Sequence, residues 1–98
     1  MPSAARVGDK TAHASTPLGP GPGSTNVLIG NKPAWRAVTD KHSCPLSTGN
    51  VAHASGTVMS GSTSVLINDF GAVRQGDQVT EVGATNPIVE GCATVIIG

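Results

Sequence analysis

Residues 23–30 read GSTNVLIG, and this stretch decides the fold because two close copies of it follow in the chain. The copies are GSTSVLIN at residues 61–68 and GCATVIIG at residues 91–98. All three follow one pattern, Gly-small-x-x-Val-aliphatic-Ile-Gly/Asn. Aliphatic triplets that are bounded by turn residues are typical of short β-strands. The sequence therefore predicts three related strand segments.

A second repeated pattern, which we call the Asp frame, precedes each strand segment. It reads PSAARVGD at residues 2–9, KPAWRAVTD at residues 32–40 and GAVRQGD at residues 71–77. The chain thus consists of three repeats of roughly 30–38 residues, a period typical of stacked or radially arranged units. No window keeps a helical period without an intervening Gly, Pro or Thr/Ser cluster. We therefore predict a single all-β domain over residues 1–98, with three repeats in pseudo-threefold symmetry, short strands and long loops.

The composition limits both the core and the partners. Thirteen Gly and seven Pro residues accompany one Trp, one Phe and no Tyr among 98 residues, which excludes an aromatic-filled core. Six Lys and Arg residues balance six Asp and Glu residues, so the basic surface that nucleic-acid binding requires is missing. Neither a basic amphipathic stretch nor an apolar run of about 20 residues is present, so we expect no stable membrane insertion. A chain so poor in large apolar residues needs an additional source of stability.

The Asp frame also aligns residues that can bind a metal. Position +4 after each frame Asp is occupied by His13, Cys44 and Glu81. His42 lies two residues before Cys44, and His53 accompanies seven extra residues in the second repeat. The three histidines and Cys44 are predicted on loops at the same end of the repeats, and zinc is the metal that such a tetrahedral donor set favours. We therefore predict one structural zinc ion bound by His13, His42, Cys44 and His53.

Other interpretations of these residues stay open. The histidines and Cys44 could be ordinary polar loop residues and a small buried hydrophobic residue. Cys92 stands where the other copies have Ser24 and Ser62, so we interpret it as a small residue that precedes a strand. A Cys44–Cys92 disulfide would be unusual in a cytosolic protein.

The frame residues themselves are interpreted as architectural. An Arg and an Asp recur once in each frame, so we expect the Asp to cap a turn and the Arg to pair with it locally. Trp35 occupies the position of Ala5 and Val73, and we expect a half-buried side chain there. The first residues, MPSAAR, contain no apolar signal core, so we expect a cytoplasmic protein whose export would not use a signal peptide.

With PSAARVGD at residues 2–9, KPAWR at residues 32–36 and the Gly-Ser-x-x-Val-Leu-Ile segments, the chain resembles the proline-alanine-alanine-arginine (PAAR) repeat family over essentially its whole length. The resemblance implies a small β-rich cone with pseudo-threefold symmetry. It implies a zinc ion near the apex, held by three histidines and one cysteine, which here are His13, His42, Cys44 and His53. None of the three frames reads Pro-Ala-Ala-Arg, and Glu81 leaves the third repeat without a ligand in this set.

The resemblance further implies a structural function rather than an enzymatic one. Such cones cap and sharpen the trimeric β-helical spike of type VI secretion systems or contractile phage tails, and help it to pierce a target envelope. The implied partners are one trimeric valine-glycine-repeat spike protein per tip and, through the flanks, cargo effectors. The chain looks like a tip without a toxin extension, which is cytoplasmic before firing and is then translocated. The alternative is a small zinc-dependent hydrolase with Glu81 as its base, but four protein ligands would leave no open position on the zinc.

Overall fold

The computed structural model describes residues 2–13, 16–48, 51–82 and 84–97; for residues 45–48 and 51–54 it describes the backbone alone. Within these residues all regular structure is β, and no helix is present that could cross a membrane. The strands are β1 (Ser3–Ala4), β2 (Pro20–Gly21), β3 (Leu28–Ile29), β4 (Lys32–Pro33), β5 (Lys41–Thr48), β6 (Val51–Val58), β7 (Leu66–Ile67), β8 (Phe70–Gly71), β9 (Gln78–Glu81), β10 (Ala84–Pro87) and β11 (Cys92–Ile96).

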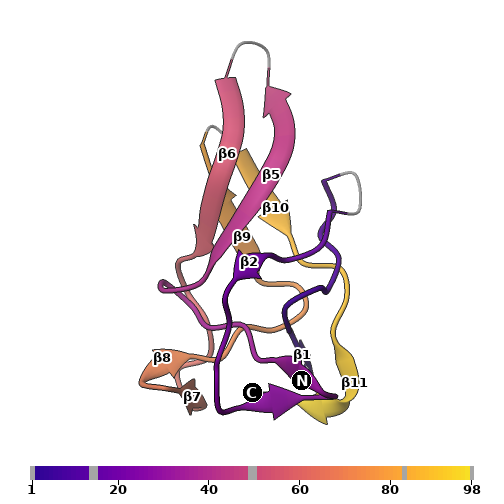
Figure 1. The fold of residues 1–98 in the computed structure, drawn as a ribbon, viewed down its shortest axis with the longest axis vertical. Coiled ribbons are helices and arrows are strands. Elements are labelled where there is room, and N and C mark those ends of the chain that lie inside the picture. Colours follow the sequence, from indigo (N-terminus) through magenta and orange to yellow (C-terminus); the bar gives the residue numbers. More distant parts are fainter. Residues whose placement is uncertain (1, 14–15, 49–50, 83, 98) are drawn as a thin grey trace.

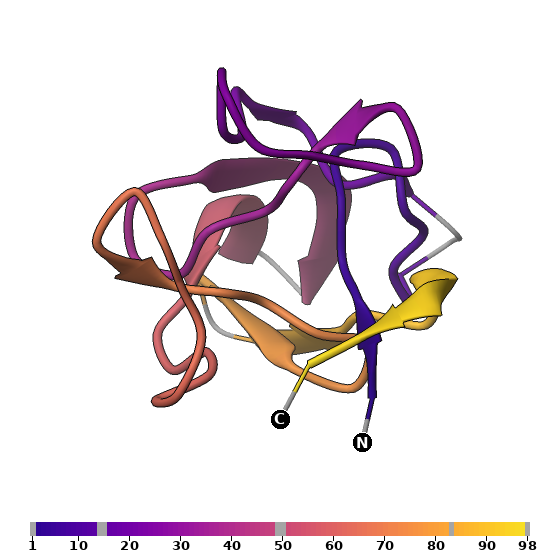
Figure 2. The ribbon, with the colours of Figure 1, turned by 90° about the horizontal axis from the view of Figure 1, so that it is seen from below.

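Backbone hydrogen bonds close a ring around a pseudo-threefold axis. The amide of Trp35 donates to the carbonyl oxygen of Ala5, the amide of Val73 donates to Trp35, and the amide of Ala5 donates to Val73, at 3.1, 3.2 and 2.9 Å. The bridges Ala4↔Arg74, Arg6↔Ala34 and Arg36↔Ala72 join the three repeats in the same cyclic order. Figure 2, which views the molecule from its broad end, shows the repeats arranged around this centre. The predicted all-β, pseudo-threefold fold is confirmed.

Two buried layers surround this ring. In the first layer the three frame alanines are completely buried next to three nearly buried isoleucines: Ala4, Ala34, Ala72, Ile29, Ile67 and Ile97. In the second layer Trp35 packs among Leu18, Val58 and Ile88. The prediction of a half-buried Trp35 is wrong, because its side chain is completely buried. Its frame position lies at the axis, and the small side chains of Ala5 and Val73 at the equivalent positions leave room for a single large one.

Three short hairpins form the broad end of the molecule, which we call the base (Figure 1). Strands β3 and β4 are joined by Gly30-Asn31, and β7 and β8 by Asn68-Asp69. All four turn residues have positive φ, between 53° and 71°, which matches the two-residue turns that follow the twist of a hairpin. The third hairpin pairs β1 with β11, so its two strands come from the two ends of this chain. Its Ser3↔Ile96 pair matches Pro33↔Leu28 in the first hairpin.

The frame residues form local ion pairs, as the sequence predicts. Each Asp carboxylate binds the guanidinium of its own Arg at 2.7–3.0 Å and also accepts the backbone amide of that Arg at 2.7–2.8 Å. The three pairs are Arg6–Asp9, Arg36–Asp40 and Arg74–Asp77. Each pair therefore fixes the turn at which the chain leaves the base.

After each frame Asp the chain forms a second hairpin, which we call an arm. The arms are residues 10–17 with the Lys10↔Pro17 bridge, the strand pair β5–β6, and the strand pair β9–β10. The second arm, which is longer by seven residues, contains the eight-residue strands β5 and β6 where the sequence predicted a long loop. It makes the molecule 38 Å long and only 23 × 22 Å across, narrowing away from the base (Figure 1).

Candidate metal centre

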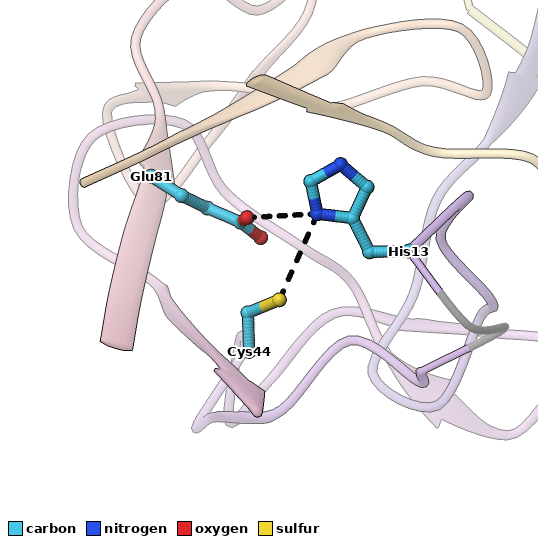
Figure 3. A group of neighbouring side chains, drawn as sticks. All are labelled: His13, Cys44 and Glu81. Atoms are coloured by element: carbon cyan, nitrogen blue, oxygen red, sulfur yellow. Dashed lines mark hydrogen bonds and ion pairs between the residues drawn. The ribbon is translucent and has the colours of Figure 1, made fainter. Parts of the chain in front are cut away.

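The three arms bring together one side chain from each repeat. His13 lies in the first arm, Cys44 in β5 and Glu81 at the end of β9, and all three occupy position +4 after their frame Asp. Figure 3 shows their side chains pointing toward one another. The pseudo-threefold axis explains this convergence, since equivalent positions on arms around one axis lie close together. Residues far apart in the chain thus form one cluster.

The donor atoms of this cluster are spaced as ligands of a single ion would be. The Nδ1 atom of His13 lies 3.1 Å from Oε1 of Glu81 and 3.7 Å from Sγ of Cys44. All three donor atoms lie within 4.8 Å of one another. At the usual zinc bond lengths, a tetrahedral ion separates nitrogen from oxygen by about 3.4 Å and nitrogen from sulfur by about 3.6 Å. The cluster therefore fits a metal ion of this size.

Alternate side chains of a β-strand point to the same face, and this places two side chains of the second repeat on the face that points toward the cluster. Residues 41–44 of β5 alternate between exposed and buried, so His42 and Cys44 share the inward face. The His42 ring is completely buried, and its Nε2 atom lies 3.8 Å from Oε2 of Glu81. Neither ring nitrogen has a hydrogen-bond partner among the described residues. Burial also lowers the pKa of His42, which favours the neutral form that a metal ligand requires.

A buried asparagine holds the cluster from behind. Asn86 donates from Nδ2 to Oε2 of Glu81 and to the Thr11 hydroxyl, both at 2.9 Å. Its Oδ1 atom accepts the backbone amide of His13 at 3.0 Å. One side chain therefore positions both the first and the third arm, as outer-shell residues of metal sites do.

The sequence-predicted ligands are partly placed by the structure. His13 and Cys44 lie in the cluster, and His42 lies beside it. His53 belongs to β6, but its side chain lies outside the described part of the structure, so its role stays a prediction. The structure adds Glu81 to the cluster. The +4 spacing pointed to Glu81, but the preference for three imidazoles and a thiolate left it out of the predicted set.

Cys92 has a different environment. Its sulfur lies 3.2 Å from the Thr94 hydroxyl on β11 in the base, and this hydrogen bond lowers the pKa of the Cys92 thiol. Cys44 and Cys92 do not form a disulfide. In the two equivalent positions, Ser24 and Ser62 accept the backbone amides of Val27 and Val65. Cys92 is itself the first residue of β11, so the interpretation that it precedes a strand is wrong by one position.

A comparison with protein families finds one match. A family model described as the PAAR motif matches residues 48–98, just over half of the chain. The matched region runs from the last residue of β5 to residue 98, beyond the end of β11, and includes Glu81. The comparison with curated proteins gives no match.

Proposed function

Because the chain belongs to the PAAR motif family, we propose that it is the structural tip of a trimeric spike. The spike would be that of a type VI secretion system or a related contractile machine. In this proposal the base binds the blunt end of a trimeric β-helical protein, and the narrow end faces the target envelope. The sheath would drive the assembly forward, and a tapered end would concentrate the force on a small area.

The observation that carries this proposal is a threefold set of exposed aliphatic side chains on the base. Leu28, Leu66 and Ile96 occupy the same position in the three base hairpins, and 60%, 61% and 48% of their surface is exposed. Exposed apolar groups that are arranged in a regular pattern are typical of protein–protein contact sites. A homotrimer presents three identical surfaces around its axis. Each subunit could therefore contact one hairpin, which gives one tip per trimer.

We further propose that the metal centre holds one structural zinc ion. The donors His13, Cys44 and His42 suit zinc, and His53 remains a predicted donor. When bound, the ion would cross-link the three arms, where the chain has little apolar core. Structural zinc sites in small peptides contribute about 10–16 kcal/mol. Glu81, which a hydrolase would need as a general base, lies within the donor cluster, so the arrangement favours a structural role.

Native mass spectrometry tests the docking proposal. The chain is mixed with a trimeric spike protein, and the mass of the complex gives its stoichiometry. We expect one chain per trimer. The double variant Leu28→Glu/Leu66→Glu should abolish the complex, because charged groups would replace two of the three apolar contacts. The matched control is Val82→Glu, since Val82 is 52% exposed but follows β9 in an arm. A 3:3 complex, or equal loss in both variants, would contradict the proposed geometry.

A further inference from the structure

The base of the free chain presents apolar side chains that nothing in the chain covers. Leu28, Leu66 and Ile96 are all exposed, so covering them with another surface is favourable. We infer that a second copy of this chain covers the base, so that two copies meet face to face as a weak homodimer. The inference rests on the proposed function in one respect, namely that the spike later takes the place of the second copy.

The charged side chains of the base differ from hairpin to hairpin. The first hairpin, residues 28–33, contains one charged side chain, Lys32, and the second, residues 66–71, contains one, Asp69. The third hairpin, which pairs β1 with β11, contains no Lys, Arg, Asp or Glu. Lys32 directly follows its two-residue turn, and Asp69 lies in the equivalent turn. The base is thus positive at one hairpin, negative at the next and uncharged at the third.

Both of these charges are available to a partner. Lys32 and Asp69 are exposed, and within the described residues neither takes part in an ion pair. The arginines of the Asp frames do not alter this pattern, because each is paired with its own aspartate and the pair recurs in every repeat.

This charge pattern matches a twofold partner and not a threefold one. A homotrimer offers the same group to each hairpin, and one group cannot attract both Lys32 and Asp69. In a twofold dimer, residue i of one copy contacts residue j of the other, and j contacts i. A twofold axis through the third hairpin, perpendicular to the pseudo-threefold axis, sets the first hairpin of each copy against the second hairpin of the other. Lys32 then faces Asp69 of the other copy, twice in the dimer.

The same arrangement matches the apolar side chains. The three hairpins lie around one centre at the broad end (Figure 2), so Leu28 of one copy meets Leu66 of the other, and Ile96 meets its own counterpart. Six Lys and Arg residues balance six Asp and Glu residues, so net charge does not keep two copies apart. The base is therefore complementary to itself in both charge and apolar contacts.

The size of the base sets the strength of this dimer. The molecule measures 23 × 22 Å across its long axis, so each copy can bury about 500 Å² of its base. The total of about 1,000 Å² lies below the roughly 1,200–2,000 Å² of stable interfaces. The homodimer is therefore weak and forms at high concentration. A weak contact suits a temporary cover, because a trimer that binds the base more tightly displaces the second copy.

Sedimentation equilibrium of the purified chain over a wide range of concentrations tests the inference. We expect the mass to rise from one chain to two and no further. Lys32→Glu should weaken association by about tenfold or more, because two attractive pairs become two repulsive ones. Lys32→Glu/Asp69→Lys should restore association, since the exchanged charges attract again. The matched control is Lys41→Glu, which makes the same charge change at an exposed residue of β5 and should associate like the wild type.

Several results would overturn the homodimer. They are a monomer at every concentration, growth beyond a dimer, and equal association of Lys32→Glu and Lys41→Glu, with circular dichroism checking that each variant folds. Trimeric spike protein in excess should convert the dimers into complexes of one chain per trimer. A dimer that passes the charge tests but binds no trimer would contradict the proposed spike docking alone. A monomer that binds the trimer would contradict the homodimer alone, so the two failures are distinguishable.

Discussion

The amide of Trp35 donates a hydrogen bond to the carbonyl oxygen of Ala5 at 3.1 Å, and the same contact recurs between the other two pairs of repeats. This cyclic set of three bonds places residues 5, 35 and 73 at the centre of the fold. Two of these residues are small, and the third is the single Trp of the chain. The core therefore depends on one large side chain at the axis.

Replacing Trp35 with Ala should destabilise the protein by about 3–5 kcal/mol, the usual cost of removing a buried large aromatic side chain. The reason is that the cavity would open at the axis, where all three repeats meet. Denaturant unfolding measures the change. Phe70→Ala is the matched control, because Phe70 is 36% exposed in a base hairpin, and it should cost much less. Equal losses in the two variants would contradict the central role of Trp35.

Cys44→Ser should abolish stoichiometric zinc binding, whereas Cys92→Ser should retain about one zinc ion per chain. Only Cys44 places its sulfur near His13, while Cys92 contacts Thr94 in the base. Elemental analysis of the purified variants measures the metal. The melting temperature of the wild type should also fall after chelation and recover when zinc is added. Metal loss in Cys92→Ser alone would show that the repeat alignment misassigns the two thiols.

Acidification should release the metal. The Cys ligand must be a thiolate and the His ligands must be neutral, so protons compete with the ion as the pH falls. In the metal-free protein, burial lowers the pKa of His42, so the unfolded chain binds more protons below its ordinary pKa of about 6.5. The His42 contribution to stability is therefore present above that pH and decreases below it. A chelator assay and urea unfolding, each repeated between neutral pH and pH 5, measure the two effects, which should have the same sign.

Asp40→Ala should destabilise the protein more than Asp77→Ala. Asp40 is completely buried and accepts the amides of both Arg36 and Gly23, whereas the Asp77 side chain is 14% exposed. Each buried donor that loses its acceptor costs roughly 1–3 kcal/mol. Thermal unfolding of the two variants compares them. If Asp77→Ala is the less stable protein, the turn of the third repeat contributes more to stability than the burial of Asp40 does.

The alignment of the three repeats made much of the candidate metal centre predictable from the sequence. Equivalent positions in cyclic repeats lie around one axis, so the +4 spacing alone brings His13, Cys44 and Glu81 together. Choosing among these candidates is a different problem, because the spacing does not say which donor an ion prefers. The preference for imidazole led to His53, whose side chain lies outside the described part of the structure, so that choice stays a prediction. The same preference left out Glu81, which the structure places in the cluster.

Two other features depended on three-dimensional context. The burial of Trp35 follows from its distance to the axis, which local composition does not reveal. The seven extra residues of the second repeat contain Ser, Thr and Gly, which are typical of a loop, but β5 and β6 pair with each other and with the neighbouring arms. The antiparallel pairing of β5 with β6, as far as Ser47↔Ala52 and Thr48↔Val51, provides the hydrogen bonds that make strands of this segment. Strands β2 and β9 pair with the ends of β5 and β6 that lie nearer the base.

The third base hairpin has a topological consequence. The amide of Ile97 donates to the carbonyl oxygen of Pro2 at 2.9 Å, so this hairpin holds residues 2 and 97 side by side. A short linker across this hairpin would therefore join the first and third repeats without moving either strand. New chain ends could then be opened between Gly30 and Asn31, or between Asn68 and Asp69, and each circular permutant should keep the same core. In such a fold, any of the three repeats can come first along the chain.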